Sequence, residues 1–222
     1  MNVVKYNIDT YNYFKSFCNT IDSKIILDYG SNYGMFLKSS NGLFPKVNYT
    51  GVDISLNAIQ IGQHLYPEAK FIHYDGHNFM YNHTGELDTK PVLDSKYDIV
   101  ISYSVFTHTT VDDMLTTLGW LYKHLNDGGK ILATWLDVDH FVSKNYFFQK
   151  RVEEFGHCDT IETDTYTYLV DNKLSDTPTN CKYLQLFFNK QYLAELLKDY
   201  NFELADAPNV KGCFQSCLII TK

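Results

Sequence analysis

The chain has 222 residues, of which 45% are hydrophobic, 20% charged and 16% aromatic, and its formal net charge is −7. This length and composition predict a single soluble globular domain. Arg151 is the only arginine. A protein that follows nucleic-acid phosphates normally carries basic clusters and several arginines. We therefore expect no nucleic-acid partner, whereas a small anionic substrate remains compatible with the acidic charge.

The five cysteines include no C-x-x-C pair, which predicts reduced thiols in the cytoplasm. No stretch approaches the length of a membrane span, and the first residues, MNVVKYNIDT, contain no long apolar segment of a signal peptide. We expect a cytoplasmic protein without a membrane partner, present as a monomer or homodimer.

Short β-like runs alternate with amphipathic helical stretches through the first two thirds of the chain. This alternation predicts a parallel sheet flanked by helices, and apolar runs such as I-I-L and D-I-V-I suit strands buried on both faces. The predicted strands are Lys24–Asp28, Asn48–Asp53, Lys70–His73, Asp98–Ser102 and Lys130–Trp135, and the predicted helices are Tyr33–Ser40, Leu56–Leu65 and Val111–Leu125.

The last quarter predicts a helix, Lys190–Tyr200, and two strands, Asn201–Ala205 and Gly212–Thr221. The connection between these strands is too short for a parallel crossover, so they should pair antiparallel. The expected fold class is α/β: a doubly wound, mostly parallel seven-stranded sheet with an antiparallel last strand and helices on both faces. We expect one domain over residues 1–222, with an N-terminal cap helix at 1–22 and an acceptor-side insertion or lid at 140–183. The polar residues 157–180 should form an excursion above the sheet.

The first predicted strand ends in a small, flexible loop that reads D-Y-G-S-N-Y-G, from Asp28 to Gly34. Ligands of open α/β sheets bind at such loops, outside the carboxyl ends of the strands. The loop does not match the dinucleotide fingerprint G-x-G-x-x-G. A carboxylate at Asp28 would repel a pyrophosphate and attract an ammonium group. S-adenosylmethionine carries an ammonium and a sulfonium and no phosphate, so Asp28 favours this cofactor.

The chain resembles the class I S-adenosylmethionine-dependent methyltransferases of the small-molecule type over nearly its whole length. Their loop pattern is D-x-G-x-G-x-G, in which Asn32 here replaces the middle glycine. Asparagine is among the residues that best tolerate left-handed backbone angles, so the turn can survive. The segment L-N-D-G-G-K resembles the family's L-x-P-G-G turn, with Asp127 in place of proline.

Several positions take on cofactor roles through this resemblance. Asp53 would accept the ribose hydroxyls, Ile54 would pack on the adenine, and Asp75 would bind the adenine amino group. The segment after Ser102 would close under the methionine moiety, and an aromatic N-terminal helix would cover the cofactor. The full cofactor-binding set is Tyr6, Tyr11, Asp28, Gly30, Ser31, Asn32, Gly34, Asp53, Ile54, Asp75, Gly76, Ser102 and Tyr103, with S-adenosyl-L-homocysteine as the product.

Methyl transfer from a sulfonium requires an aligned acceptor and, for a hydroxyl acceptor, removal of a proton. His108 follows the fourth strand and is the first candidate for a general base; Asp137 and His140 follow the fifth. Positioning alone can also accelerate the reaction, so a base is not obligatory. Metal-dependent relatives draw an acid from the end of strand four, where Ser102-Tyr103-Ser104 stands here, so we expect no metal.

We expect the acceptor to contact Tyr103, Lys144 and Arg151, the last two cations lying among aromatic residues of the insertion. No N-P-P-Y-type tetrapeptide and no Pro-Cys pair occur, which argues against nucleic-acid methylation. The sequence predicts an O-methyltransferase of a small polar metabolite, such as a sugar, a nucleotide-sugar or a phosphorylated glycan precursor. An N-methyltransferase of an amino-sugar or amine is the alternative, and a nicotinamide-dependent oxidoreductase or a non-catalytic cofactor-binding scaffold stays open.

Overall fold

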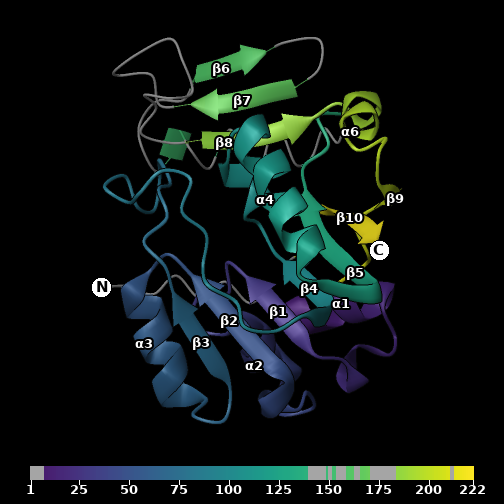
Figure 1. Ribbon diagram of the computed structural model, residues 1–222. Helices are drawn as coiled ribbons and strands as arrows, with labels where there is room; N and C mark the ends of the chain where they lie inside the picture. Colours follow the sequence, from purple (N-terminus) through teal and green to yellow (C-terminus); the bar gives the residue numbers. More distant parts are fainter. Residues whose placement is uncertain are drawn as a thin grey trace.

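The computed structural model describes residues 8–139, 149, 152–153, 159–162, 166–170, 184–210 and 213–222. Two sheets are formed, one of seven strands and one of three (Figure 1). The strands are β1 Ile26–Tyr29, β2 Tyr49–Asp53, β3 Lys70–His73, β4 Tyr97–Ser102, β5 Leu125–Trp135, β6 Asp159–Glu162, β7 Tyr166–Val170, β8 Leu184–Phe188, β9 Asn201–Ala205 and β10 Ser216–Thr221. The helices are α1 Thr10–Phe17, α2 Met35–Ser40, α3 Leu56–Leu65, α4 Val111–Lys123 and α6 Lys190–Leu196, with 3₁₀ turns η1 Ile21–Ser23, η2 Lys46–Asn48 and η3 Phe106–His108.

The seven-stranded sheet has the order β3-β2-β1-β4-β5-β10-β9. The pairs from β3 to β5 are all parallel, whereas β10 runs antiparallel to both β5 and β9. The order reverses between β1 and β4, which creates a topological switch point at their carboxyl ends. The predicted fold class, with its antiparallel last strand, is confirmed.

The two faces of the sheet carry separate cores because neighbouring residues of a strand point to opposite sides. Ile26 belongs to the cluster that contains residues of α1, α2 and α3, whereas Leu27 belongs to the cluster that contains residues of α4 and α6. Ile99 and Val100 on β4 divide in the same way. Helices therefore cover both faces, and α4 crosses the front of the sheet in Figure 1.

The predicted helix starts agree with the structure where a side chain caps the helix. Ser55 accepts a hydrogen bond from the amide of Ala58, Thr110 from that of Asp113, and Asn189 caps α6. Such caps satisfy amides that have no partner within the helix.

The boundary predicted at the end of α4 is wrong. The helix ends at Lys123, and β5 begins at Leu125 instead of Lys130. The strand therefore spans the glycine pair that was expected to form the turn. Leu125 pairs with Tyr97, and after a register shift the pairing resumes between Lys130 and Ile99. Residues 126–129 lie within this register shift, where Gly128 keeps a left-handed φ of 74° and both glycines form backbone hydrogen bonds with Lys222, just after β10.

The three-stranded antiparallel sheet β6-β7-β8 was not predicted. Its first two strands lie in the polar segment that was expected to be an excursion. Phe188 of β8 accepts a hydrogen bond from the amide of Val138 and donates one to Leu136, just after β5. The small sheet, at the top of Figure 1, is thereby anchored at the carboxyl end of β5.

Among the described residues, no helix is long and apolar enough to cross a membrane.

Leu118 gives a direct test of the packing between α4 and the sheet. Its side chain is completely buried in the core cluster on that face. We expect Leu118→Ala to lower the free energy of unfolding by about 2–5 kcal/mol, because the lost contacts leave a cavity. Urea unfolding measures the change. Thr116→Ala, at an exposed position of the same helix, is the control and should change it by less than about 0.5 kcal/mol.

Candidate active site

The loop after β1 contains three residues with left-handed backbone angles. The φ angles of Gly30, Asn32 and Gly34 are 80°, 51° and 86°. The expectation that Asn32 adopts the conformation normally given to glycine is therefore confirmed. A Cβ atom at Gly30 would lie 2.2 Å from a methyl carbon of Val105, so only glycine fits beneath the segment that follows β4.

The carboxylate of Asp53 joins this loop to the end of β2. It accepts hydrogen bonds from the backbone amides of Asn32, at 2.7 Å, and Ser55, at 2.8 Å. The amides of Gly30 and Ser31 both donate to the carbonyl of Val52, one residue earlier. Burial raises the pKa of Asp53, and the amide hydrogen bonds act in the opposite direction. The loop and the acid form one rigid unit at the switch point.

Asp28 lies deeper than the sequence suggested. It is the third residue of β1, is 5% exposed, and accepts a 2.6 Å hydrogen bond from the hydroxyl of Tyr49. Burial raises the pKa of its carboxyl to about 7, with the Tyr49 hydrogen bond opposing and the charge of Asp53 adding to the shift. The sequence predicted a fully charged carboxylate beside the loop, and this prediction is wrong. Asp28 lies within β1, just before the loop, and its carboxyl is only partly ionised near neutral pH.

The remaining predicted cofactor residues divide into two groups. Ile54 follows Asp53 directly and is partly buried, and Gly76, which is buried, follows the exposed Asp75 after β3. The carboxylate of Asp75 accepts a hydrogen bond from Asn82, which fixes the loop that leads toward β4. These residues all lie at the carboxyl edge of the sheet.

In the second group, the side chains make contacts with other residues of the protein. Ser102 is fully buried and donates to the carbonyl of Tyr29, which holds the end of β1. The hydroxyl of Tyr11 donates to Asp22, on the amino-terminal side of β1 and away from the glycine loop. Tyr103 packs edge-on against Tyr13, and burial raises its pKa. Tyr6 lies outside the described residues.

The predicted base His108 ends η3, immediately beyond β4, and is 7% exposed. Its ring stands perpendicular to that of Tyr81, with centroids 5.5 Å apart. Its carbonyl accepts a hydrogen bond from Asn78, which also binds the amide of Tyr81 through its side-chain oxygen. The loop between β3 and β4 therefore forms one wall around this histidine.

Asp137 is partly buried after β5 and pairs with Phe188 through a backbone bridge, while its carboxylate accepts the amide of Asp139. The other predicted residues, His140, Lys144 and Arg151, lie outside the described residues. Among the residues that the structure describes, no cluster of three or more His, Cys, Asp or Glu side chains could hold a metal ion.

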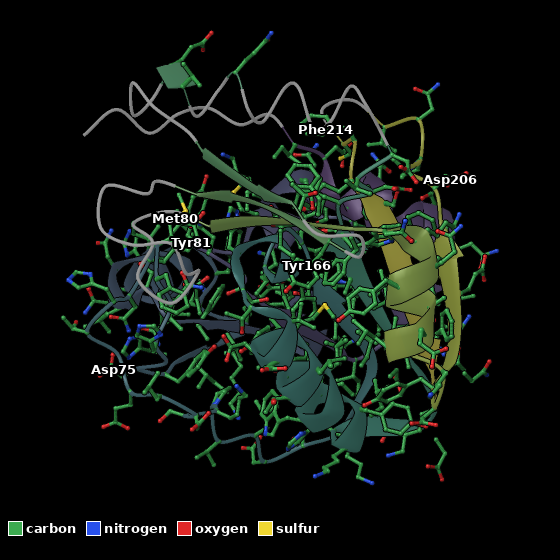
Figure 2. The ribbon with its side chains drawn as sticks, turned by 90° about the horizontal axis from the view of Figure 1, so that it is seen from above. Asp75, Met80, Tyr81, Tyr166, Asp206 and Phe214 are labelled. Carbon is green, nitrogen blue, oxygen red and sulfur yellow. The ribbon has the colours of Figure 1, made fainter. Side chains whose placement is uncertain are left out.

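An apolar group that the sequence did not reveal lies at the same edge. Leu136 and Phe187 are buried there, and Met80, Val138 and Phe214 pack against them. Figure 2, which views the molecule from above, shows Met80 next to Tyr81. These side chains come from the loop after β3, the end of β5, β8 and the segment before β10, so no local pattern could have identified them.

The strand order and the loop define a Rossmann-like protein that binds a nucleoside-containing cofactor at its switch point. A family model described as a methyltransferase domain matches residues 14–207, and the chain belongs to this family. The protein is a class I S-adenosylmethionine-dependent methyltransferase. The residues present fit this cofactor: Asp53, the residue expected to accept the ribose hydroxyls, lies beside a loop in which Val105 leaves no space for a side chain at Gly30.

Solved structures share the fold at low identity. An S-adenosylmethionine-dependent methyltransferase from Clostridium acetobutylicum is 12% identical with a TM-score of 0.58, over 96% of this chain and 90% of that one. An amino pentose methyltransferase from Micromonospora echinaspora, with bound S-adenosylmethionine, is 15% identical with a TM-score of 0.56, over 96% and 88%. A glycopeptide N-methyltransferase bound to S-adenosylhomocysteine is 11% identical with a TM-score of 0.56, over 97% and 90%.

We expect Asp53→Ala to weaken binding of S-adenosylhomocysteine by at least about tenfold, because hydrogen bonds to a charged group are worth about 1.5–3 kcal/mol each. Isothermal titration calorimetry measures the affinity. Asp127→Ala, at the exposed start of β5 on the opposite edge, is the matched control and should bind normally. An unchanged affinity in Asp53→Ala would contradict the ribose assignment.

The raised pKa of Asp28 predicts a pH-dependent stability. Above pH 4 the unfolded chain has lost this proton, whereas the folded protein keeps it until about pH 7. The contribution of Asp28 to the free energy of unfolding therefore falls as the pH rises from about 4 to about 7 and then levels off. Asp28→Asn removes this pH-dependent contribution. The free energy of unfolding of the variant minus that of the wild type should therefore increase between pH 5 and pH 8. Urea unfolding at both values tests this, and a constant difference would refute it.

Proposed function

We propose that the protein transfers the methyl group of S-adenosylmethionine to a hydroxyl of a small polar metabolite, with a sugar, a nucleotide-sugar or a phosphorylated glycan precursor as the acceptor class. The observation that carries this proposal is the position of His108. It lies just beyond β4, next to the switch point, with Tyr81 against its ring. A hydroxyl must lose its proton during methylation, and a histidine in this position can accept it.

The surroundings of His108 support a small acceptor. The apolar group of Leu136, Phe187 and their neighbours lies at this edge, together with the hydroxyl and amide side chains of Ser104, Thr107 and Gln215. A sugar presents apolar C–H faces and polar hydroxyls, which matches such a mixed lining. The net charge of −7 and the single arginine also favour a small molecule over a nucleic acid.

N-methylation of an amino-sugar or amine is the second candidate. Two proteins of the same fold are described as an amino pentose methyltransferase and a glycopeptide N-methyltransferase. An amine that binds in its neutral form needs no base before it attacks the methyl group, so His108 would then be less important.

The direct test supplies isotopically labelled S-adenosylmethionine and an extract of metabolites and glycan precursors, followed by mass analysis. We expect label in a small hydroxylated product. Fragmentation that places the methyl group on nitrogen would favour the second candidate, and the absence of label in every small-molecule fraction would contradict both.

We expect His108→Ala to lower kcat by about 10²–10⁴-fold while the affinity for S-adenosylhomocysteine changes little, because general-base catalysis contributes in this range. His77→Ala, on the loop between β3 and β4, is the control and should retain turnover. Initial rates at saturating cofactor and at a saturating concentration of the acceptor identified by the labelling experiment give kcat. An unchanged kcat in His108→Ala would remove it as the base and leave positioning as the mechanism.

A further inference from the structure

Four polar side chains lie close together at the carboxyl edge of β4 and β5, on the side of the sheet that α1 covers. They are Ser104, Thr107, Thr134 and Gln215, here called the Gln215 cluster. Because β10 is antiparallel to β5, the residue before its start lies at the edge where β4 and β5 end. The Nε2 of Gln215 donates to the hydroxyl of Ser104 at 3.0 Å. That hydroxyl also lies 3.1 Å from the hydroxyl of Thr107, the residue before His108.

Gln215 carries an acceptor that has no donor within the described part of the chain. Its side chain is 3% exposed, and its Oε1 has no hydrogen-bond partner among the residues that the structure describes. The backbone carbonyl of the same residue accepts the hydroxyl of Tyr13 at 2.8 Å, which holds the segment in place. A buried carbonyl oxygen without a donor is costly, so it commonly marks a position that a ligand or water completes.

The backbone of Ser104 gives independent evidence for a specialised site. Its φ angle is 59°, in the left-handed region that serine rarely adopts. The amide of Ser104 donates to Thr134 at 2.7 Å, and Gln215 holds its hydroxyl, so the neighbouring strands maintain the strained conformation. Strain of this kind concentrates at binding and catalytic sites.

The cluster is one layer below the surface. Ser104, which is hydrogen-bonded to Gln215, and Phe214, which precedes Gln215 in sequence, are both partly exposed. Phe214 belongs to the apolar group with Met80 and Leu136, and Figure 2 shows it at the carboxyl edge viewed from above. Gln215 therefore follows Phe214 of the apolar group in sequence, and Ser104 links its side chain to Thr107, the residue before His108.

We propose that Gln215 is a ligand-binding residue, whose Oε1 accepts a hydrogen bond from an O–H or N–H group of the methyl acceptor and so orients the acceptor beside His108. This inference rests on the proposed function for the identity of the ligand. The ammonium group of S-adenosylmethionine offers the same donor chemistry. Because β10 lies beyond β5 from the switch point, the acceptor side is favoured over the cofactor side.

Gln215→Met tests the inference, since it keeps the length of the side chain and removes the Oε1 acceptor together with the Nε2 donor to Ser104. Binding of S-adenosylhomocysteine is measured by calorimetry, and label transfer from S-adenosylmethionine is measured against increasing amounts of the metabolite extract. We expect unchanged cofactor affinity and at least about fivefold more extract for half-maximal transfer. Gln63→Met, the same change at an exposed position on α3, is the control and should alter neither quantity.

The melting temperature separates ligand binding from a structural role. Gln215→Met also loses the Nε2 hydrogen bond to Ser104, so its melting temperature is compared with that of Ser104→Ala, which loses the same hydrogen bond and keeps Oε1. Because an unsatisfied buried oxygen contributes no stability, the melting temperature of Gln215→Met should lie within about 2 °C of that of Ser104→Ala or above it. A larger decrease would identify Gln215 as a structural residue and overturn the inference. A fivefold loss of S-adenosylhomocysteine affinity would show that Oε1 binds the cofactor. It would overturn the proposal that Oε1 binds the methyl acceptor.

The two proposals fail in different ways. If the wild type transfers no label to any small molecule, the proposed function fails. If the wild type transfers label and Gln215→Met matches it in both binding and half-saturation, only the role of Gln215 is refuted.

Discussion

The site depends on the carboxylate of Asp53, which holds the loop after β1 against the end of β2. Its two oxygens accept the amides of Asn32 and Ser55, so one side chain fixes both the turn and the start of α3. Left-handed angles at alternate loop residues let the backbone pass closely under Val105. The segment after β4 rests on the same loop, because Val105 lies directly over Gly30.

The antiparallel direction of β10 has a second consequence. In a wholly parallel sheet, the segment before a strand would lie at the amino-terminal edge. Here that segment reaches the carboxyl edge and brings Phe214 and Gln215 beside the ends of β4 and β5. The β6-β7-β8 sheet is anchored next to them through Phe188. The edge beyond β5 is therefore assembled from segments that are far apart in sequence, whereas the region around the glycine loop is built from consecutive β–α units.

Burial changes the electrostatic interpretation of the loop. A negative charge at Asp28 was the sequence-based reason to favour a cationic cofactor, yet the structure places this carboxyl inside the sheet under Tyr49. The exposed edge of the loop is instead shaped by its backbone and by Asp53. The assignment of S-adenosylmethionine therefore rests on the family to which the chain belongs and not on the charge of Asp28.

The sequence by itself determined the chain order of the seven strands of the large sheet and the helices between them, the antiparallel closing pair, the starts of α3, α4 and α6 and the left-handed turn at Asn32. These features depend on local residue spacing and backbone preference, which a single segment carries. Only the tertiary structure decided where β5 begins, how β6 to β8 pair, the burial of Asp28 and the meeting of Gln215 with Ser104. Each of these depends on contacts between distant segments, and burial, strand register and unsatisfied hydrogen bonds arise only when those segments pack together.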